Sequence, residues 1–242
     1  MHHKHNIQIL LWDIDGTILD FEKAEEAAIR KGFAVHGLGE CTDEMLADYS
    51  VINRGYWQKL ERGEMTKPRI LVERFREFFG KYGLDTTKAE AFNADYQVNL
   101  GDTICFRDDA LSVIQRIPKD IGQYVVTNGT AIAQHRKLSL SGLEEIMDGY
   151  YISDEVGFEK PGIEYFNAVF ADLRKKYGEV DPGKVMIIGD SLTSDIRGGN
   201  NAGLICCWYN PKGLKNDKGL RIDYEIRSLQ EVPELLGSWG RG

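Results

Sequence analysis

Residues 9–21 of the chain read ILLWDIDGTILDF, a short apolar run that ends abruptly in two aspartates. The first part of this stretch predicts a buried strand, because consecutive apolar residues without polar alternation are typical of strands covered on both faces. Asp13 and Asp15 follow at once, and Gly16 permits a tight turn there. Two carboxylates at the end of a core strand repel each other, so their placement calls for a partner that offsets their charge.

The composition is that of a globular protein. The chain has 242 residues, of which 42% are hydrophobic and 28% are charged, enough for one sizeable core and a smaller second unit. Its net charge is -8 and it has no basic block, so a nucleic acid polymer is an unfavourable partner. No apolar run has the length of a secretory signal or a membrane span, so we expect a cytoplasmic protein without a membrane partner.

Cysteines and histidines give no sign of a metal centre of their own. The four cysteines lack CxxC spacing and are expected to be reduced thiols, two of them, Cys206 and Cys207, within an apolar run. Three histidines close to the start of the chain are expected to be solvated, with weak metal binding as the alternative: His2, His3 and His5.

Short apolar runs and helical patterns alternate in the second half of the chain. Five runs predict strands: residues 7–12, 124–127, 150–153, 184–190 and 204–209. Residues 163–178 predict a helix with one apolar stripe, which ends at Gly178. Alternation of strand and helix is the signature of a doubly wound, Rossmann-like parallel sheet, so the fold class is α/β.

Residues 21–101 have a different character, because they contain no strand-like run. Four helical patterns fill this segment, each closing near a glycine: residues 22–37, 44–63, 67–83 and 87–101. We therefore expect an all-helical cap over residues 21–101, inserted into a core formed by residues 1–20 and 102–242. The insertion leaves the sheet next to Asp13 and Asp15, so the cap is expected to lie over them.

In an open parallel sheet, ligands bind beyond the carboxyl ends of the strands. Polar side chains are expected at this edge after four of the runs: Asp13 and Asp15 after the first, Thr127 and Asn128 after the second, Lys160 in the loop after the third, and Asp190 and Asp195 after the fourth. Several carboxylates, one lysine, one hydroxyl and one amide would thus meet in one crevice.

This grouping suits phosphoryl transfer. Clustered carboxylates are tolerable around a divalent cation, and Mg²⁺ prefers oxygen ligands. With the cation present, Asp13 is able to attack phosphorus and form an aspartyl-phosphate. Asp15 is placed to protonate the leaving alkoxide and then to deprotonate the attacking water. Thr127, Asn128 and Lys160 suit the phosphate oxygens.

Each element of the pattern also has a plainer interpretation. Residues 13–16 resemble an ordinary turn, and Asp195 would stabilise a helix N-terminus. Taken singly, Thr127 and Lys160 favour the plainer interpretation, as a strand-to-helix connection and a solvated loop residue. Taken together, in this order and each at the end of a strand, they favour a phosphoryl-transfer site.

Two other classes of protein use similar acidic patterns. An EF-hand calcium loop needs glycine at its sixth position and glutamate at its twelfth, and counting from Asp13 these positions hold Ile18 and Ala24. A non-catalytic phospho-acceptor module would also combine acids with a threonine and a lysine. The large helical insertion argues against it, because such a module needs no lid.

The motifs DIDGT, VTNG, EKPG and GDSLTSD resemble, in this order, the four motifs of the haloacid dehalogenase (HAD) superfamily of phosphatases. The helical insertion is similar to the small cap of that family. Two longer stretches, ISDEVGFEKPGIEYF and GDSLTSDIRGGNNAGLICCWYNP, resemble the branch of pyrimidine 5′-nucleotidases. The resemblance implies Asp13 as nucleophile and metal ligand, and Asp15 as acid/base with its carbonyl on the metal. It implies Thr127 and Asn128 as phosphate ligands and Lys160 as the residue that steadies nucleophile and phosphate. Asp190 would complete the metal site, with Asp195 as an alternative metal ligand or a residue just behind the ligands.

The resemblance implies a Mg²⁺-dependent phosphomonoesterase that hydrolyses nucleoside 5′-monophosphates. A broad-range sugar phosphate or phosphoglycolate phosphatase is the alternative, and a phosphomutase a weaker one. The second aspartate and Asp190 argue against a dehalogenase, and Asp15 in place of a threonine favours hydrolysis over a transport ATPase. Four cap residues were candidates for contacts to a base, with packing on the cap core as the favoured role: Tyr49, Arg54, Tyr56 and Trp57.

Overall fold

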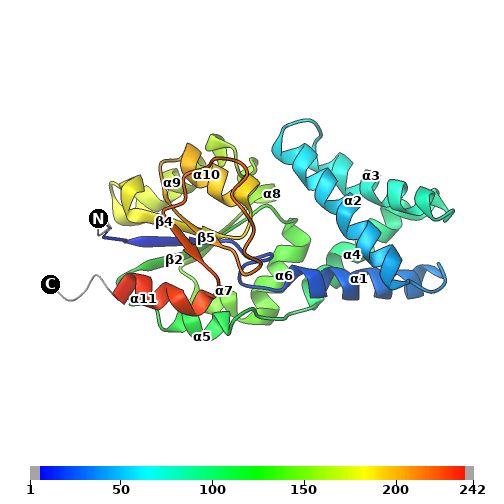
Figure 1. Cartoon of the computed structure of the whole chain (residues 1–242), viewed down its shortest axis with the longest axis horizontal. Coiled ribbons are helices and arrows are strands. Elements are labelled where there is room, and N and C mark those ends of the chain that lie inside the picture. Colours follow the sequence, from blue (N-terminus) through cyan, green and yellow to red (C-terminus); the bar gives the residue numbers. More distant parts are fainter. Residues whose placement is uncertain (1–5, 238–242) are drawn as a thin grey trace.

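The structure of the chain is a computed structural model that describes residues 6–237. A sheet flanked by helices forms one part of the molecule, and a group of helices forms the other (Figure 1). The histidines near the start of the sequence, His2, His3 and His5, lie outside the described residues. Within the described part, no helix combines the length and the apolar character that a membrane crossing needs.

The sheet has six parallel strands in the order β3-β2-β1-β4-β5-β6. The strands are β1 (Ile9–Trp12), β2 (Gly122–Thr127), β3 (Gly149–Ile152), β4 (Val185–Gly189), β5 (Ile205–Tyr209) and β6 (Tyr224–Ile226). Five of them overlap the predicted runs, which confirms the α/β class. The sequence did not predict β6, because this edge strand has only three residues and just one of them, Ile226, is buried.

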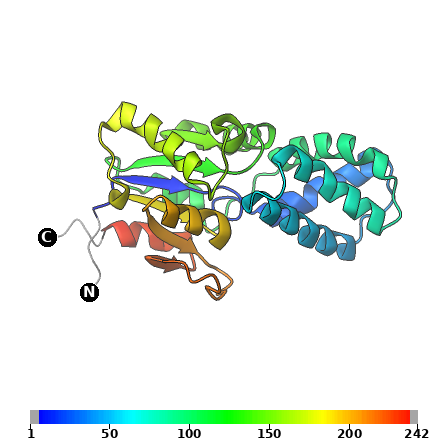
Figure 2. The ribbon, with the colours of Figure 1, turned by 90° about the horizontal axis from the view of Figure 1, so that it is seen from above.

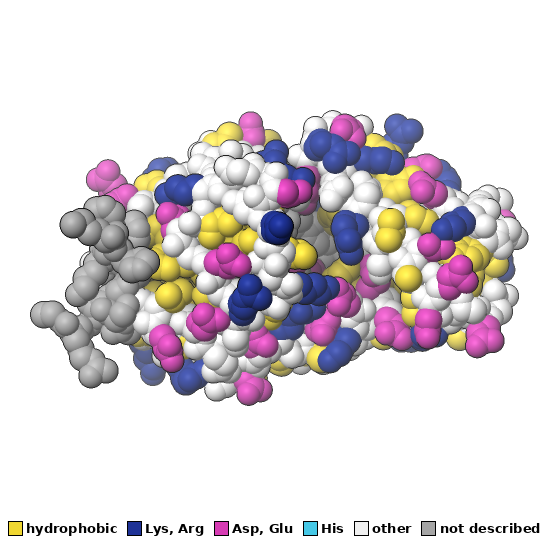
Figure 3. Space-filling view, viewed as in Figure 1, with side chains coloured by type: hydrophobic (Ala, Val, Ile, Leu, Met, Phe, Trp, Pro, Cys, Tyr) yellow, Lys and Arg dark blue, Asp and Glu magenta, His cyan; other side chains and the backbone are white. Residues whose placement is uncertain are grey.

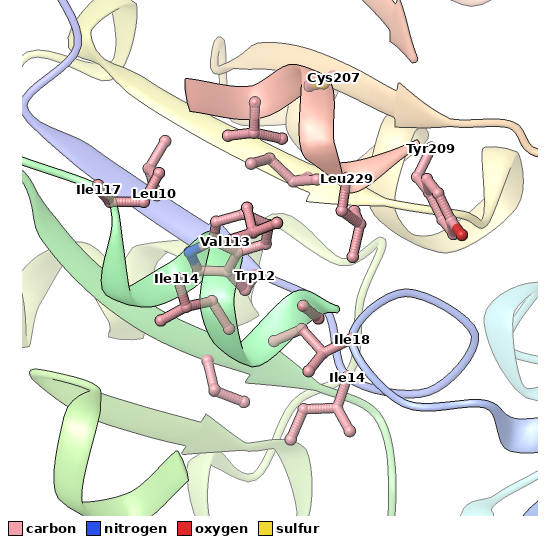
Figure 4. Packing of buried hydrophobic residues seen from close by; sticks show 14 of the residues in the cluster. Leu10, Trp12, Ile14, Ile18, Val113, Ile114, Ile117, Cys207, Tyr209 and Leu229 are labelled. Atoms are coloured by element: carbon pink, nitrogen blue, oxygen red, sulfur yellow. The ribbon is translucent and has the colours of Figure 1, made fainter. Parts of the chain in front are cut away.

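Helices cover both faces of the sheet (Figure 1). One face carries α5 (Ala110–Gln115), α6 (Ala131–Ser141), α7 (Leu143–Ile146) and α11 (Val232–Gly237). The other carries α9 (Ile163–Tyr177) and α10 (Arg197–Asn201), while α8 (Ser153–Val156) follows β3 directly. Leu10 and Trp12 of β1 point into the first layer, where they pack with Val113, Ile114 and Leu229 (Figure 4). The alternate residues Ile9 and Leu11 fill the second layer, so β1 is covered on both faces.

Four helices form the second part of the molecule (Figure 2). They are α1 (Phe21–His36), α2 (Asp43–Glu61), α3 (Lys67–Lys81) and α4 (Ala89–Asp102), and they match the predicted helical patterns closely. They enclose an aromatic cluster, in which Tyr49 stacks on Phe75 with ring centroids 5.1 Å apart. We call these four helices the cap. The division of the chain into independent domains at residues 20–21 and 101–102 stays a prediction.

Helix α6 belongs to the layers of the core but also packs on the cap. Ala133 of α6 lies in the aromatic cluster of the cap, and Leu138 of the same helix lies in the core cluster. α6 therefore connects the two parts close to the carboxyl edge of the sheet (Figure 1). Four shorter turns complete the structure: η1 (Thr86–Lys88), η2 (Pro182–Lys184), the π-helical turn η3 (Leu192–Ile196) and η4 (Leu229–Glu231).

Candidate active site

Asp13 is the first residue after β1, and its carboxylate is buried. Lys160 Nζ donates a hydrogen bond to Asp13 Oδ1 over 2.8 Å, and Thr17 Oγ1 donates to Asp13 Oδ2 over 3.2 Å. Each carboxylate oxygen is thus held by a donor from a different segment. A carboxylate fixed in this way has few orientations, which favours attack on a substrate atom held in line with it.

Lys160 lies between α8 and α9 and is itself buried. Its Nζ also donates to Asp195 Oδ1 over 2.6 Å and to the carbonyl of Val126 over 2.8 Å. Asn128 holds its backbone, because Lys160 N–H donates to Asn128 Oδ1 over 2.8 Å and Asn128 Nδ2 donates to the Lys160 carbonyl over 2.7 Å. Burial lowers the pKa of Lys160, but the charges of Asp13 and Asp195 outweigh burial and raise it above its usual value.

Three carboxylates meet beside this lysine. One oxygen each of Asp13, Asp190 and Asp195 lies within 4.8 Å of the other two. Burial raises the pKa of Asp13 well above its usual range; the charge of Asp195 adds to this rise, and Lys160 opposes it. Burial of the carboxyl, with the charge of Asp195, also raises the pKa of Asp190 to about 7. The cluster therefore carries more negative charge than one lysine offsets.

The donor set of this cluster fits a divalent cation. Carboxylate oxygens are hard ligands of the kind that Mg²⁺ prefers, and a cation among them would offset both the burial and the mutual repulsion that raise the pKa values of Asp13 and Asp190. Asp13, Asp190 and Asp195 are the residues that would hold it. The carboxylate of Asp15 is not part of this group within the described residues, so only its backbone carbonyl remains as the predicted ligand.

The turn after β1 packs tightly against the end of β4. Gly16 has a φ of +93°, and a Cβ at this position would lie 2.6 Å from Asp190 Oδ2. Only glycine meets both the backbone conformation and the close approach. Thr17 Oγ1 accepts a hydrogen bond from Asp190 N–H over 3.1 Å, so Thr17 touches both Asp13 and Asp190. The sequence analysis assigned no role to Thr17, although it follows the glycine of the DIDGT motif.

The two predicted phosphate ligands lie at the carboxyl end of β2, where Thr127 is the last residue of the strand and Asn128 is the first residue after it. Thr127 is buried, and its Oγ1 accepts a hydrogen bond from Gly129 N–H over 3.1 Å. The register of β1 and β2 pairs Trp12 with Val125, which brings the residues after both strands side by side. The structure therefore groups Thr127 and Asn128 with Asp13 and Lys160. Their role in phosphate binding stays a prediction.

The carboxylate of Asp15 points to α6. Gln134 Nε2 donates to Asp15 Oδ2 over 2.7 Å, and Lys137 Nζ forms an ion pair with Asp15 Oδ1. Lys137 and Gln134 are both buried. The sequence analysis missed these two residues, because it did not recognise α6 as a separate helix. Their spacing of three residues on one helical face was the available signal.

A pocket of about 740 Å³ opens over the cluster, between the core and the cap. In the space-filling view, a hollow with Lys and Arg side chains around it separates the two parts (Figure 3). Asp15, Gly16 and Asp190 line its core side, together with Trp208. The segment that follows β5 borders it with residues that include Lys212. The volume falls in the range of sites that enclose a small organic molecule.

The structure separates the four candidate cap residues into two pairs. Arg54 and Trp57 line the pocket. Tyr49 is buried in the aromatic cluster, and Tyr56 packs with Leu60 and donates its hydroxyl hydrogen bond to Glu77 over 2.9 Å. Packing, the favoured role, therefore holds for the tyrosines, whereas Arg54 and Trp57 face the pocket.

Three relatives align with almost the whole chain. YfnB of Bacillus subtilis, which bears the name of a HAD-hydrolase, is 37% identical over 227 residues, 94% of each chain. The pyrimidine 5′-nucleotidase PynA of Streptococcus pneumoniae is 32% identical, over 95% of this chain and 94% of its own. The pyrimidine 5′-nucleotidase YjjG of Escherichia coli is 28% identical, over 94% and 96% of the two chains.

A solved structure agrees with these relatives. The crystal structure of YfnB bound to magnesium, described as revealing interdomain movement, superimposes with a TM-score of 0.88 at 35% identity. It covers 96% of this chain and 99% of the YfnB chain. The sequence model of the haloacid dehalogenase-like hydrolases matches residues 7–203, which include every residue of the cluster described above. The chain therefore belongs to the haloacid dehalogenase-like hydrolase family.

Proposed function

We propose that the protein is a Mg²⁺-dependent phosphomonoesterase that hydrolyses nucleoside 5′-monophosphates through an aspartyl-phosphate. The observation that carries this proposal is the buried Asp13 carboxylate, held by Lys160 and Thr17 beside two further aspartates. Family membership supports a phosphatase, since two relatives at 32% and 28% identity are pyrimidine 5′-nucleotidases. The magnesium in the YfnB crystal structure supports Mg²⁺ as the ion.

In the first step, one Asp13 oxygen attacks the phosphorus, and the bond from phosphorus to the ester oxygen breaks. Asp15 gives its proton to the leaving alkoxide. Lys160 and Thr17 keep the nucleophile oriented. The hydroxyl of Thr127 offers a hydrogen-bond donor to a phosphate oxygen, and the charge of Lys160 attracts the phosphate. A bound Mg²⁺ would supply the positive charge that lets an anionic carboxylate approach an anionic phosphate.

In the second step, water attacks the phosphorus of the aspartyl-phosphate and the bond from phosphorus to the Asp13 oxygen breaks. Asp15, left deprotonated by the first step, accepts the proton of the water. Inorganic phosphate leaves, and Asp13 returns to its carboxylate form. Between the two steps, Gln134 and Lys137 would hold the deprotonated Asp15 carboxylate through the contacts seen in the structure.

The pocket favours a nucleotide over the smaller alternatives. A volume of about 740 Å³ exceeds what phosphoglycolate needs, and Trp57 offers an indole ring on the cap side. Aromatic faces bind planar bases well, at roughly 1–3 kcal/mol per base. A sugar phosphate would fill the polar end of the pocket and leave this ring without a partner.

The experiment that tests the proposal is a screen of phosphate release from nucleoside monophosphates, sugar phosphates and phosphoglycolate, with and without Mg²⁺. We expect hydrolysis of nucleoside 5′-monophosphates that chelation of Mg²⁺ abolishes. Asp13→Asn should eliminate turnover and leave the thermal unfolding transition in place. Full activity of Asp13→Asn with Mg²⁺ would refute the role of Asp13, and equal rates on all esters would refute the nucleotide specificity.

A further inference from the structure

The cap wall of the pocket contains a buried acid. Glu25 of α1 lines the pocket, although only 4% of the residue is exposed. Asn53 Nδ2 donates to Glu25 Oε1 over 2.7 Å, and the hydroxyl of Ser50 donates to Glu25 Oε2. Both donors come from α2, and both also line the pocket. The two helices thus fix a carboxylate at the end of the pocket that belongs to the cap.

A network behind Glu25 keeps this acid in place. Arg74 NH1 donates to Asn53 Oδ1 over 2.7 Å, and Arg74 NH2 donates to Asn93 Oδ1 over 3.1 Å. The guanidinium of Arg74 is buried and lies 5.0 Å from the ring centroid of Tyr96. Asn53 therefore stands between Arg74 and Glu25. Such a chain of hydrogen bonds restricts the rotamers of every member.

Within residues 6–237, Glu25 forms no direct ion pair with a lysine, arginine or histidine. Burial raises its pKa, and the hydrogen bonds from Ser50 and Asn53 and the charges of Arg74 and Arg54 oppose this rise. A carboxylate accepts about four hydrogen bonds, and the protein supplies two of them. Because Glu25 lies on the pocket wall, its remaining acceptor sites are open to water in the free protein and to a donor of a bound ligand. A purely structural role would not require the acid to border the pocket.

The surroundings of Glu25 suit a planar group. Phe21 of the same helix and Trp57 of α2 line the pocket with their rings, and Arg54 lies beside Trp57 in the wall. The phosphoryl group belongs on the core side of the pocket, which Asp15, Gly16 and Asp190 line. The leaving group of the substrate therefore extends toward Glu25, where a neutral ring with a donor meets no charge repulsion.

We propose that Glu25 is a specificity-determining residue that accepts a hydrogen bond from an N–H donor on the base of the substrate. The donor is the exocyclic amine of cytosine or the ring imide of uracil, both on the Watson–Crick edge. Carboxylates accept from the cytosine amine in other recognition sites. This inference rests on the proposed function and adds to it the chemistry that separates a nucleotide from a base-free phosphate ester.

The test compares substrates that differ only in this donor. Wild-type protein with Mg²⁺ is assayed on cytidine and uridine 5′-monophosphates and on 2-pyrimidinone riboside 5′-monophosphate, which has no N–H on the base. We expect kcat/KM to be about tenfold to a hundredfold lower for the pyrimidinone, the usual cost of losing a hydrogen bond to a charged group. Equal values for the three nucleotides would overturn the proposal.

The Glu25→Gln variant tests whether Glu25 is the residue that causes the preference for a base with an N–H donor. Its amide still accepts from Asn53, and it is able to donate to the hydroxyl of Ser50, so the fold should tolerate it. We expect the preference over the pyrimidinone to fall severalfold, because the amide oxygen is a neutral and weaker acceptor than the carboxylate. The value of kcat/KM for ribose 5-phosphate and p-nitrophenyl phosphate, which have no base to bind, should stay within about twofold. Glu26→Gln is the matched control, since Glu26 is the next residue, lines the same pocket and pairs with Arg30 at the surface; it should keep the full preference.

Other outcomes would contradict either the role of Glu25 or the proposed function. An equal loss on all esters in Glu25→Gln would show a structural role and overturn the inference. A preference over the pyrimidinone that is as large in Glu25→Gln as in the wild type would also overturn the inference. If Glu25→Gln does not fold, Glu25→Asp, which keeps the charge but withdraws the acceptor, should reduce the preference. Wild-type protein that hydrolyses base-free esters but no nucleotide would refute the proposed function itself.

Discussion

Lys160 and Asp195 form a buried ion pair of 2.6 Å between Nζ and Oδ1, although Lys160 lies in the loop between α8 and α9 and Asp195 lies in η3. The same Nζ lies 2.8 Å from Asp13 Oδ1 and 2.8 Å from the carbonyl of Val126. All three N–H donors of the ammonium are thus in use. Lys160 therefore has a structural task, the pairing of two buried acids, in addition to its proposed contact with phosphate.

Lys160→Met should destabilise the protein by about 3–5 kcal/mol, because it leaves buried carboxylates without their cation. Turnover should be lost as well. Urea denaturation in the absence of Mg²⁺ measures the free energy of unfolding, and added Mg²⁺ should restore part of it by replacing the missing charge. Lys175→Met, which removes an exposed lysine paired with Asp172, should change stability by less than about 1 kcal/mol. A Lys160→Met protein as stable as wild type would contradict the pairing role.

The stability of the metal-free protein should fall as the pH rises from about 4 to about 7. The pKa of Asp190 rises from 3.8 to about 7 on folding, through burial and the charge of Asp195, and that of Asp13 also rises. The folded state therefore holds these protons more tightly than the unfolded state, and the stability gained at low pH is lost as they dissociate.

Mg²⁺ should reverse this trend, because its ligands must be deprotonated. The upward shift of the unfolding temperature by Mg²⁺ should be larger at about pH 8 than at about pH 5. Differential scanning fluorimetry at both pH values, with Mg²⁺ and with a chelator in its place, measures this shift in the unfolding temperature. Asp190→Asn should reduce both the pH trend and the effect of Mg²⁺. The same temperature shift at both pH values would argue against a cation at this cluster.

Lys137→Met should lower kcat/KM for alkyl phosphates by roughly tenfold to a hundredfold, since the variant removes the ion pair that positions Asp15. The defect should shrink for p-nitrophenyl phosphate, whose leaving group departs without a proton. A structural defect would affect both substrates equally. Arg136→Met is the control on the same helix, because Arg136 pairs with Asp102 at the surface and not with Asp15. Identical losses on both substrates would refute a role through Asp15.

The sequence predicted the parts of the structure that depend on local pattern. Buried parallel strands are continuous apolar runs, so β1 and β4 were visible, and the acids that follow them were placed correctly at one edge. The cap helices were visible because amphipathic patterns closing at glycines span residues 21–101. Alternation of strand and helix implies parallel strands, which places Asp13 and Asp190 at one edge of the sheet. Their close approach also needs β1 and β4 to be neighbours, and the sequence did not specify this strand order.

The contacts of Asp15 depended on tertiary packing and were not predictable in the same way. Gln134 and Lys137 reach Asp15 only because α6 sits between the core and the cap, and no local signal encodes that position. Glu25 is a similar case, since an acid within an amphipathic helix normally predicts a solvated face. Its burial follows from the partners that α2 and α3 bring, Asn53 and Arg74. Trp57 and Tyr56 are adjacent in sequence, and only the packing of α2 decides which of them faces the pocket.

The contact between Lys67 and the core should control how firmly the cap is held. Lys67 starts α3, is 6% exposed, and donates to Ser153 Oγ over 2.5 Å and to Asp154 Oδ1 over 2.7 Å. Asp154 Oδ2 in turn accepts the N–H of Ala131 at the start of α6, over 2.9 Å. A cation of the cap is thus anchored in α8 of the core, and Asp154 connects α8 with the start of α6.

Lys67→Met should loosen this attachment and let the cap open more widely, which raises KM severalfold while kcat for bound substrate changes less. Small-angle scattering of the free protein should show a larger radius of gyration than wild type, and amide exchange should accelerate at the start of α3 and in α8. Lys81→Met, in the same helix, removes a lysine whose partner Asp48 lies within the cap, so it should leave cap position and KM unchanged. The relative YfnB undergoes interdomain movement, as its crystal structure with magnesium is described. If Lys67→Met leaves both exchange at the contact and KM at wild-type values, the cap is held by its hinge segments and its aromatic packing on α6, and Lys67 does not set the balance between open and closed forms.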